Sequence, residues 1–140
     1  METNWRDGVK VVRAQTITQA RGANNGRATV FDFAGSGGVA TWIGSVALAP
    51  LVSTGKHHHG KHEVMLHVVK GRTEIRWGEQ LEFAAMLVPG DFAYFTPFVP
   101  HQELNPDARE TAEFIVVRSD NERIAIKLDG DVVEKPETFY

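Results

Sequence analysis

The sequence contains no cysteine, and this absence excludes several classes of protein at once. Disulfide-stabilised folds, thiol catalysis, cysteine-ligated zinc sites and iron–sulfur clusters all need cysteine side chains. An excess of basic residues is also missing, because 15 lysines and arginines stand against 18 acidic residues. Proteins that bind duplex nucleic acid usually carry such an excess, so the sequence predicts no nucleic-acid partner.

Long apolar runs are absent as well. No segment approaches the ~20 consecutive apolar residues that a membrane-spanning helix needs. Residues 1–7 are polar and lack the apolar stretch of a secretory signal peptide. The sequence therefore predicts a cytoplasmic protein that has no membrane partner.

What is present fits a globular domain with one core. The chain has 140 residues, of which 42% are hydrophobic and 24% are charged. These proportions are ordinary for a globular protein, and a chain of this length can bury a core of its own. We therefore expect residues 1–140 to form a single domain.

Short apolar runs, broken by Gly, Pro, Asn and Asp, dominate the sequence, and a helical period is hard to find. Residues 73–77 alternate polar and apolar side chains, which is typical of a half-buried strand. Several short strands with turns between them favour an all-β sandwich or barrel, whereas the charged tail 132–140 is expected to be loose. The expected strands are 41–49, 64–69, 73–77, 81–88, 92–95, 111–118 and 123–128, with weaker candidates at 9–12 and 29–33.

Histidine is the most informative residue type. Five of the six histidines lie between His57 and His67, and the sixth is His101. His57 and His59 project to the same face of an extended segment, because strand side chains alternate. Neutral imidazole suits zinc, copper, iron and nickel, and mixed sets of histidine and carboxylate suit iron and manganese. The alternative interpretation is a solvated histidine-rich turn that binds metal only adventitiously.

His57 and His59 form an H-x-H motif that Gly71 closes, and Gly90, His101 and Asn105 form a second motif at the expected separation. Over residues 40–117 the sequence thus resembles the cupin superfamily, of the small cupin 2 type. The resemblance implies a double-stranded β-helix, a jelly-roll barrel of antiparallel strands, with a metal near its mouth.

The sequence also departs from these motifs. Leu51 and Phe98 stand at two positions where the family often has glycine, and Thr96 stands at a proline position. Val64 occupies the position of the usual glutamate ligand, and Glu63 comes one residue early. A shift of one residue turns a strand side chain to the other face, so Glu63 would need a bulge or a shortened turn.

Three residues are therefore candidates for a fourth ligand beside the three histidines. Glu63 matches the glutamate of the motif in residue type. His62 would face the same side of a strand as Val64, but it is expected in the turn. Glu103 follows His101 by two residues and would face the same way on an extended segment. This H-x-E arrangement resembles that of pirins, a cupin branch in which the glutamate is a ligand. We favour Glu103, with His62 and Glu63 as alternatives.

Three or four protein ligands leave open positions on a metal that prefers five or six, and open positions are typical of catalytic sites. The resemblance implies one divalent transition metal (Fe, Mn, Ni, Cu or Zn) and dioxygenase-type chemistry on a small oxygenated organic substrate. Two alternatives are a lyase or isomerase that uses the metal as a Lewis acid, and a non-catalytic cupin that binds a small ligand or has a regulatory role. The resemblance also implies a homodimer.

Overall fold

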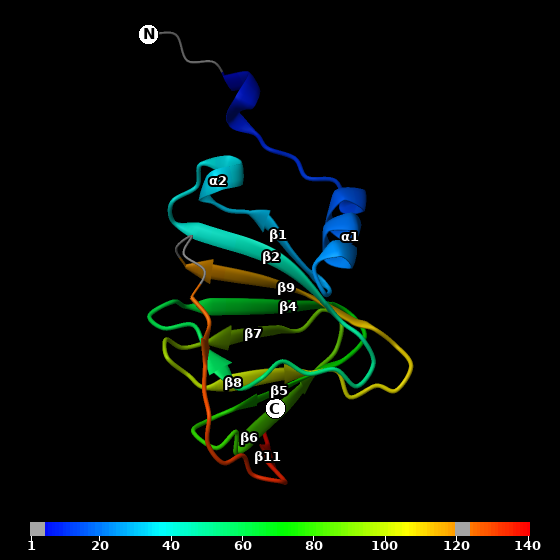
Figure 1. The fold of residues 1–140 in the computed structure, drawn as a ribbon, viewed down its shortest axis with the longest axis vertical. Helices are drawn as coiled ribbons and strands as arrows, with labels where there is room; N and C mark the ends of the chain where they lie inside the picture. Colours follow the sequence, from blue (N-terminus) through cyan, green and yellow to red (C-terminus); the bar gives the residue numbers. More distant parts are fainter. Residues whose placement is uncertain (1–4, 120–123) are drawn as a thin grey trace.

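The computed structural model describes residues 5–119 and 124–140, and its strands form two sheets (Figure 1). In the described residues, the first sheet has the order β1-β2-β9-β4-β7 and the second has the order β10-β3-β8-β5-β6-β11. Strand β11 runs parallel to β6, and the other pairings are antiparallel. The predicted all-β class is confirmed.

The elements of the described chain have the following bounds. The strands of the first sheet are β1 (Arg27–Phe31), β2 (Thr41–Leu48), β9 (Ala112–Ser119), β4 (Val64–Lys70) and β7 (Phe92–Phe95). Those of the second sheet are β10 (Ile126–Lys127), β3 (His57–His58), β8 (His101–Leu104), β5 (Thr73–Trp77), β6 (Phe83–Leu87) and β11 (Glu137–Thr138). The helical segments are η1 (Trp5–Gly8), α1 (Ala14–Ala23) and α2 (Phe33–Ser36).

The hydrophobic core lies between the two sheets and follows from the period of two in their strands. Along β4, Val64, Leu66 and Val68 are buried, whereas Met65, between the first two, and Val69, after the third, are exposed. Removing such side chains from water is the main force that holds the sheets together, at roughly 25 cal/mol per Å² of apolar surface. The core cluster consists of Trp42, Leu48, Val64, Leu66, Val68, Ile75, Ala85, Leu87, Phe95, Phe114 and Val116.

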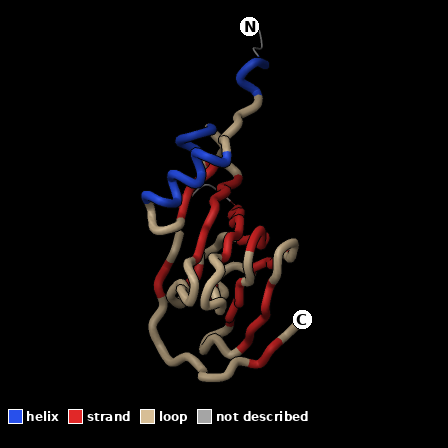
Figure 2. The backbone as a smooth tube through the Cα atoms, turned by 90° about the vertical axis from the view of Figure 1, so that its right-hand side faces the viewer, coloured by secondary structure: helices blue, strands red, loops and turns tan. Residues whose placement is uncertain are grey.

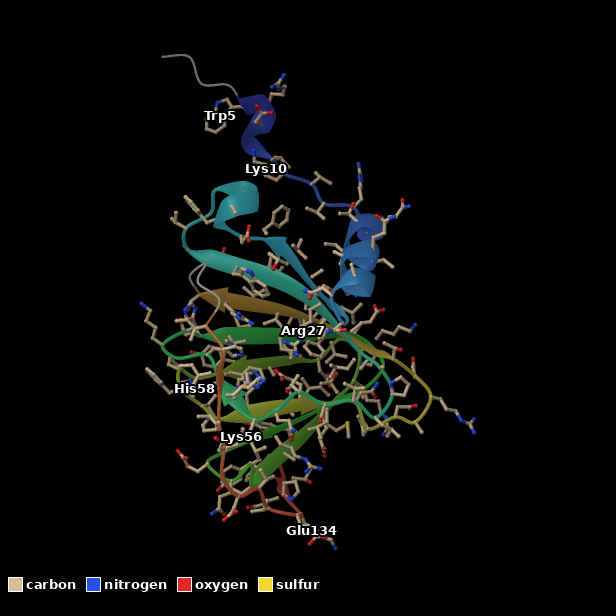
Figure 3. The ribbon with its side chains drawn as sticks, in the orientation of Figure 1. Trp5, Lys10, Arg27, Lys56, His58 and Glu134 are labelled. Atoms are coloured by element: carbon tan, nitrogen blue, oxygen red, sulfur yellow. The ribbon has the colours of Figure 1, made fainter. Side chains whose placement is uncertain are left out.

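The N-terminal part differs from the sequence prediction. Residues 14–23 form helix α1, which the sequence pattern did not indicate because the helix has no fully buried residue and hence no marked apolar face. Residues 9–12 form no strand and lead into α1, while β1 begins at Arg27 rather than at residue 29. Figure 3 shows Trp5 and Lys10 beyond the sheets at this end of the molecule. None of the described helices is long and apolar enough to cross a membrane.

The C-terminal tail is attached rather than loose, which corrects the prediction for residues 132–140 (Figure 2). Backbone N–H groups of Glu137 and Phe139 donate hydrogen bonds to Glu82 and Ala84, and so add β11 to the sheet. The Phe139 ring packs against Phe83, with ring centroids 5.5 Å apart. These contacts hold the tail on the sheet although many of its residues are charged. Of the strand expected over 123–128, only Ile126–Lys127 is a strand, and residue 123 lies outside the described residues.

Candidate metal centre

Three histidines from distant parts of the chain converge between the sheets. His57 begins β3 and His101 begins β8, and the two residues are direct partners across these strands. One ring nitrogen from each of His57, His59 and His101 lies within 4.8 Å of the others. The ring centroids of His57 and His101 are 4.3 Å apart, and that of His59 is 4.8 Å from His57. The H-x-H spacing and the second motif together thus predicted a real spatial cluster.

Backbone carbonyl groups orient all three imidazole rings. Nδ1 lies 2.7 Å from Gly55 O in His57, 2.7 Å from Ile124 O in His59 and 3.0 Å from Val99 O in His101. A carbonyl oxygen only accepts hydrogen bonds, so Nδ1 carries the proton in each neutral ring and Nε2 has the free electron pair. Oriented imidazoles of this kind are typical of metal-binding histidines. The three residues therefore fit a transition metal that is bound through Nε2.

Electrostatics keep two of the rings neutral, which is the form that binds metal. Burial lowers the pKa of His57 and more than offsets the opposing effect of Glu103. Burial also lowers the pKa of His59 to about 3, and the positive charge of Arg118 acts in the same direction. Both imidazoles are consequently ready to bind a cation at neutral pH without first losing a proton.

Glu103 lies beside the triad and is buried, although a strand-end glutamate is usually exposed. Its Oε1 is 3.5 Å from His101 Nε2, and its Oε2 is 3.9 Å from His57 Nε2. Burial alone would raise the pKa of this carboxyl, but the hydrogen bond and the charge of His101 outweigh it and hold the pKa at about 2. Reciprocally, Glu103 raises the pKa of His101 against the effect of burial.

Thr54 holds the Glu103 carboxylate in place, a role that the sequence did not reveal. Thr54 Oγ1 donates to Glu103 Oε2 over 3.0 Å and accepts from the Glu103 backbone N–H, also over 3.0 Å. Two ligands bound at about 2.1 Å to one ion lie roughly 3 Å apart when they are neighbours in its coordination shell. A small movement of Glu103 would bring it to that distance from the ring nitrogens.

The two other fourth-ligand candidates lie elsewhere. His62 is buried, its Nδ1 contacts Ser119 O, and it borders a cavity of about 330 Å³ together with Lys61 and Ser119. Glu63 is exposed and accepts a 2.5 Å hydrogen bond from Tyr94 Oη. Among the described residues, the converging ligand atoms belong to the three histidines alone. Glu103 lies next to this cluster, whereas His62 and Glu63 have partners elsewhere. Val64, at the usual glutamate position, is a core residue.

Two further motif residues, Asn105 and Gly71, have structural roles. Asn105 is buried, and its Nδ2 donates to the carbonyls of Leu48, Ala49 and Glu110, which ties β2 to the β8–β9 connection. Gly71 has φ +69°, and an added Cβ would lie 2.8 Å from Thr111 O. These two residues stabilise the fold that carries the histidines and do not belong to the site itself.

Comparisons with known proteins identify the fold of this chain. No protein-family model matches the chain, and no curated protein sequence matches it significantly. Among solved structures, a cupin 2 domain-containing protein from Halorhodospira halophila gives a TM-score of 0.65 at 24% identity, covering 74% of this chain and 70% of that chain. The chain has the cupin fold.

Two further structures extend this likeness. A conserved protein with a double-stranded β-helix domain from Klebsiella pneumoniae subsp. pneumoniae has a TM-score of 0.63 at 18% identity, covering 74% of this chain and 84% of that chain. Oxalate oxidase in complex with glycolate has a TM-score of 0.64 at 18% identity and covers 75% of this chain. The chain matches only 56% of the oxalate oxidase chain. At these identities the cupin fold is shared, and function must be argued from the site.

Proposed function

We propose that this cupin is a metal-dependent enzyme that binds one divalent transition metal through His57, His59 and His101, with Glu103 as the fourth ligand. The observation that carries the proposal is the convergence of one ring nitrogen from each of the three histidines, whose rings are fixed by carbonyl groups at Nδ1. In support, His101 Nε2 is buried and its contact with Glu103 is at the limit of a hydrogen bond. A buried nitrogen without a good partner is costly unless something binds it.

We further propose dioxygenase-type oxidation of a small oxygenated organic substrate. When bound, iron or manganese would supply the oxygen chemistry, and mixed imidazole and carboxylate donors suit both metals. The protein residues supply position and environment. Phe95, buried, packs its ring 4.4 Å from that of His101 and forms an apolar wall, whereas His57 is partly exposed and marks the side open to solvent. The likeness to an oxalate oxidase, at 18% identity, concerns the fold, so the reaction is argued from the donor set and its surroundings.

Metal content tests the site. The parent protein, His57→Ala, His101→Ala and the control His58→Ala are purified without added metal and measured by mass spectrometry. His58 is the matched control because its Nδ1 accepts a hydrogen bond from its own turn, at Gly60 N. We expect nearly one metal per chain in the parent and the control, and loss of the metal in the other two. Retention of metal by both of those variants, with the fold intact, would show that the site is wrong.

Glu103→Gln separates the fourth ligand from the triad, because it keeps the shape of the side chain and removes its charge. We expect metal affinity to fall about 10-fold or more, with the fold retained. Unchanged affinity would remove Glu103 from the ligand set and leave the three histidines as the metal ligands.

Oxygen uptake by the metal-loaded parent protein with diketones and catechol-like compounds then tests the reaction. Stoichiometric metal without oxygen uptake would overturn the oxygenase reaction and direct assays to lyase and isomerase substrates.

A further inference from the structure

Four inward-facing residues form a row across the first sheet, at the level of the histidines. Arg118 on β9 is the direct partner of Trp42 on β2 and of Val64 on β4, and Val64 is in turn the partner of Phe95 on β7. Residues that are direct partners share one face of a sheet. Because Phe95 contacts the His101 ring, the row places the Arg118 side chain on the face that looks toward the histidines.

The Arg118 guanidinium is held over the Trp42 ring, at 4.4 Å from the ring centroid. Trp42 is buried, and its ring lies so close to Gly44 that an added Cβ there would be 2.1 Å from it. Glycine at 44 therefore gives the indole its place beneath the guanidinium. Stacking on an aromatic ring uses the face of a guanidinium, whereas a carboxylate binds at its edge through paired N–H donors. The two contacts are compatible in one arginine.

Charge near the centre favours an anionic ligand. Arg118 carries a permanent positive charge on the same inner face as Phe95, whose ring packs against His101. A divalent ion with one carboxylate ligand keeps one net positive charge. That charge and Arg118 repel each other in a poorly screened interior, and an anion that contacts both would offset the repulsion.

We propose that Arg118 binds the carboxylate of a small organic acid whose second oxygen donor coordinates the metal held by the histidines. This inference rests on the proposed function and narrows its substrate to the class of small carboxylic acids with a neighbouring hydroxyl or oxo group. Arginine suits the role because its planar donors match both carboxylate oxygens, and such charge-assisted pairs are stronger than neutral hydrogen bonds.

Lactate and lactamide are suitable probes because they have nearly the same shape and differ in charge. The protein is loaded with Co²⁺, its metal content is measured, and each probe is titrated while the visible absorption of the cobalt is followed. We compare the parent, Arg118→Gln, Arg118→Lys and the control Arg72→Gln. Arg72 is exposed, with its Nη2 atom 3.8 Å from Asp107 Oδ2.

We expect lactate to bind the parent at least about 10-fold more tightly than lactamide. Arg118→Gln should lose about that factor for lactate and change lactamide binding little, Arg118→Lys should be intermediate, and Arg72→Gln should match the parent. Lactate binding that Arg118→Gln leaves unchanged would overturn the inference. If Arg118→Gln does not fold, the lysine variant decides, because an unchanged ratio of the two affinities would equally overturn it. Failure of the parent to take up Co²⁺ would instead refute the proposed metal site.

Discussion

Leu51 and Phe98 share the left-handed backbone conformation, with φ of 63° and 66°. Each lies a few residues before a histidine of the triad, at a position where the motifs often have glycine. The Leu51 N–H donates to Asp107 O over 3.1 Å, and the Phe98 N–H donates to Gly60 O over 2.8 Å. The turns thus keep the geometry that glycine favours while carrying side chains, which costs roughly 1–2 kcal/mol at each position.

Replacing Leu51 tests this strain. Leu51 is exposed, so Leu51→Gly removes the unfavourable Cβ contacts and loses little burial. We expect the free energy of unfolding, measured with urea, to stay level or rise by up to about 1 kcal/mol. Leu51→Ile, which is branched at Cβ, should lower it by roughly 1–2 kcal/mol. A glycine variant that is clearly less stable than the isoleucine variant would show that the Leu51 side chain has another role.

Asn105 is expected to be among the residues most sensitive to a small chemical change. Asn105→Asp keeps the size of the side chain but removes an amide that donates to three carbonyl oxygens, and it places a charge against them. We expect urea denaturation to show a loss of about 3 kcal/mol or more. The control Gln15→Glu makes the same change of amide to acid on the exposed first turn of α1, and it should alter stability by less than about 0.5 kcal/mol. Equal effects of the two changes would contradict the structural role of Asn105.

The sequence predicted those features that depend on local pattern. Residues 73–77 and 92–95 are strands with the expected bounds, because alternation and the flanking turns define them locally. His57 and His101 could be paired because two motifs fix their separation. Helix α1 was missed, since it lies exposed on the sheet and one of its main links is an ion pair from Arg21 to Glu113 at 3.5 Å.

Other features depend on contacts between distant segments and leave no local pattern. The carbonyl group that orients His59 belongs to Ile124, and any residue type would supply it. The tail is fixed by pairing with β6, which its charged composition does not indicate. For Glu63, counting along the motif placed it one residue from the ligand position, and the structure gives it a surface partner in Tyr94 instead.

Gly71 and Gly37 separate two costs of replacing glycine. Both have positive φ, +69° and +81°, but an added Cβ at Gly71 would lie 2.8 Å from Thr111 O, whereas Gly37 has open space around it. Gly37→Ala should therefore lower the free energy of unfolding by about 1 kcal/mol, from backbone strain alone. Gly71→Ala adds the close approach and should cost at least about 1 kcal/mol more. Thermal and urea denaturation check the difference, and equal losses would show that the β9 backbone moves away at no cost.

The stability of the metal-free protein should fall as the pH falls, and His59 sets the upper part of the window. Its pKa is about 3 in the folded protein, against an ordinary value of 6.5, because of burial and the charge of Arg118. Between these values the unfolded chain binds the proton and the folded chain does not, so stability decreases from pH 6.5 downward. Glu103, whose pKa is about 2 instead of 4.5, adds a loss in the same direction below pH 4.5.

The contribution of His101 to stability changes with pH in the opposite direction and does not affect the pH range below 6.5. Its pKa is raised, so its contribution is complete below pH 6.5 and is lost as the pH rises. Urea denaturation in the presence of a chelator at pH 6.5, 5.5 and 4.5 measures this loss. His57, whose pKa burial also lowers, contributes beside His59, and each group adds at most about 1.4 kcal/mol per pH unit. His59→Asn should give a shallower slope than the parent, whereas His67→Asn leaves His59 in place and should keep the parent's slope. If His59→Asn loses stability with pH as steeply as the parent, then burial of a neutral His59 is not what couples this fold to protons.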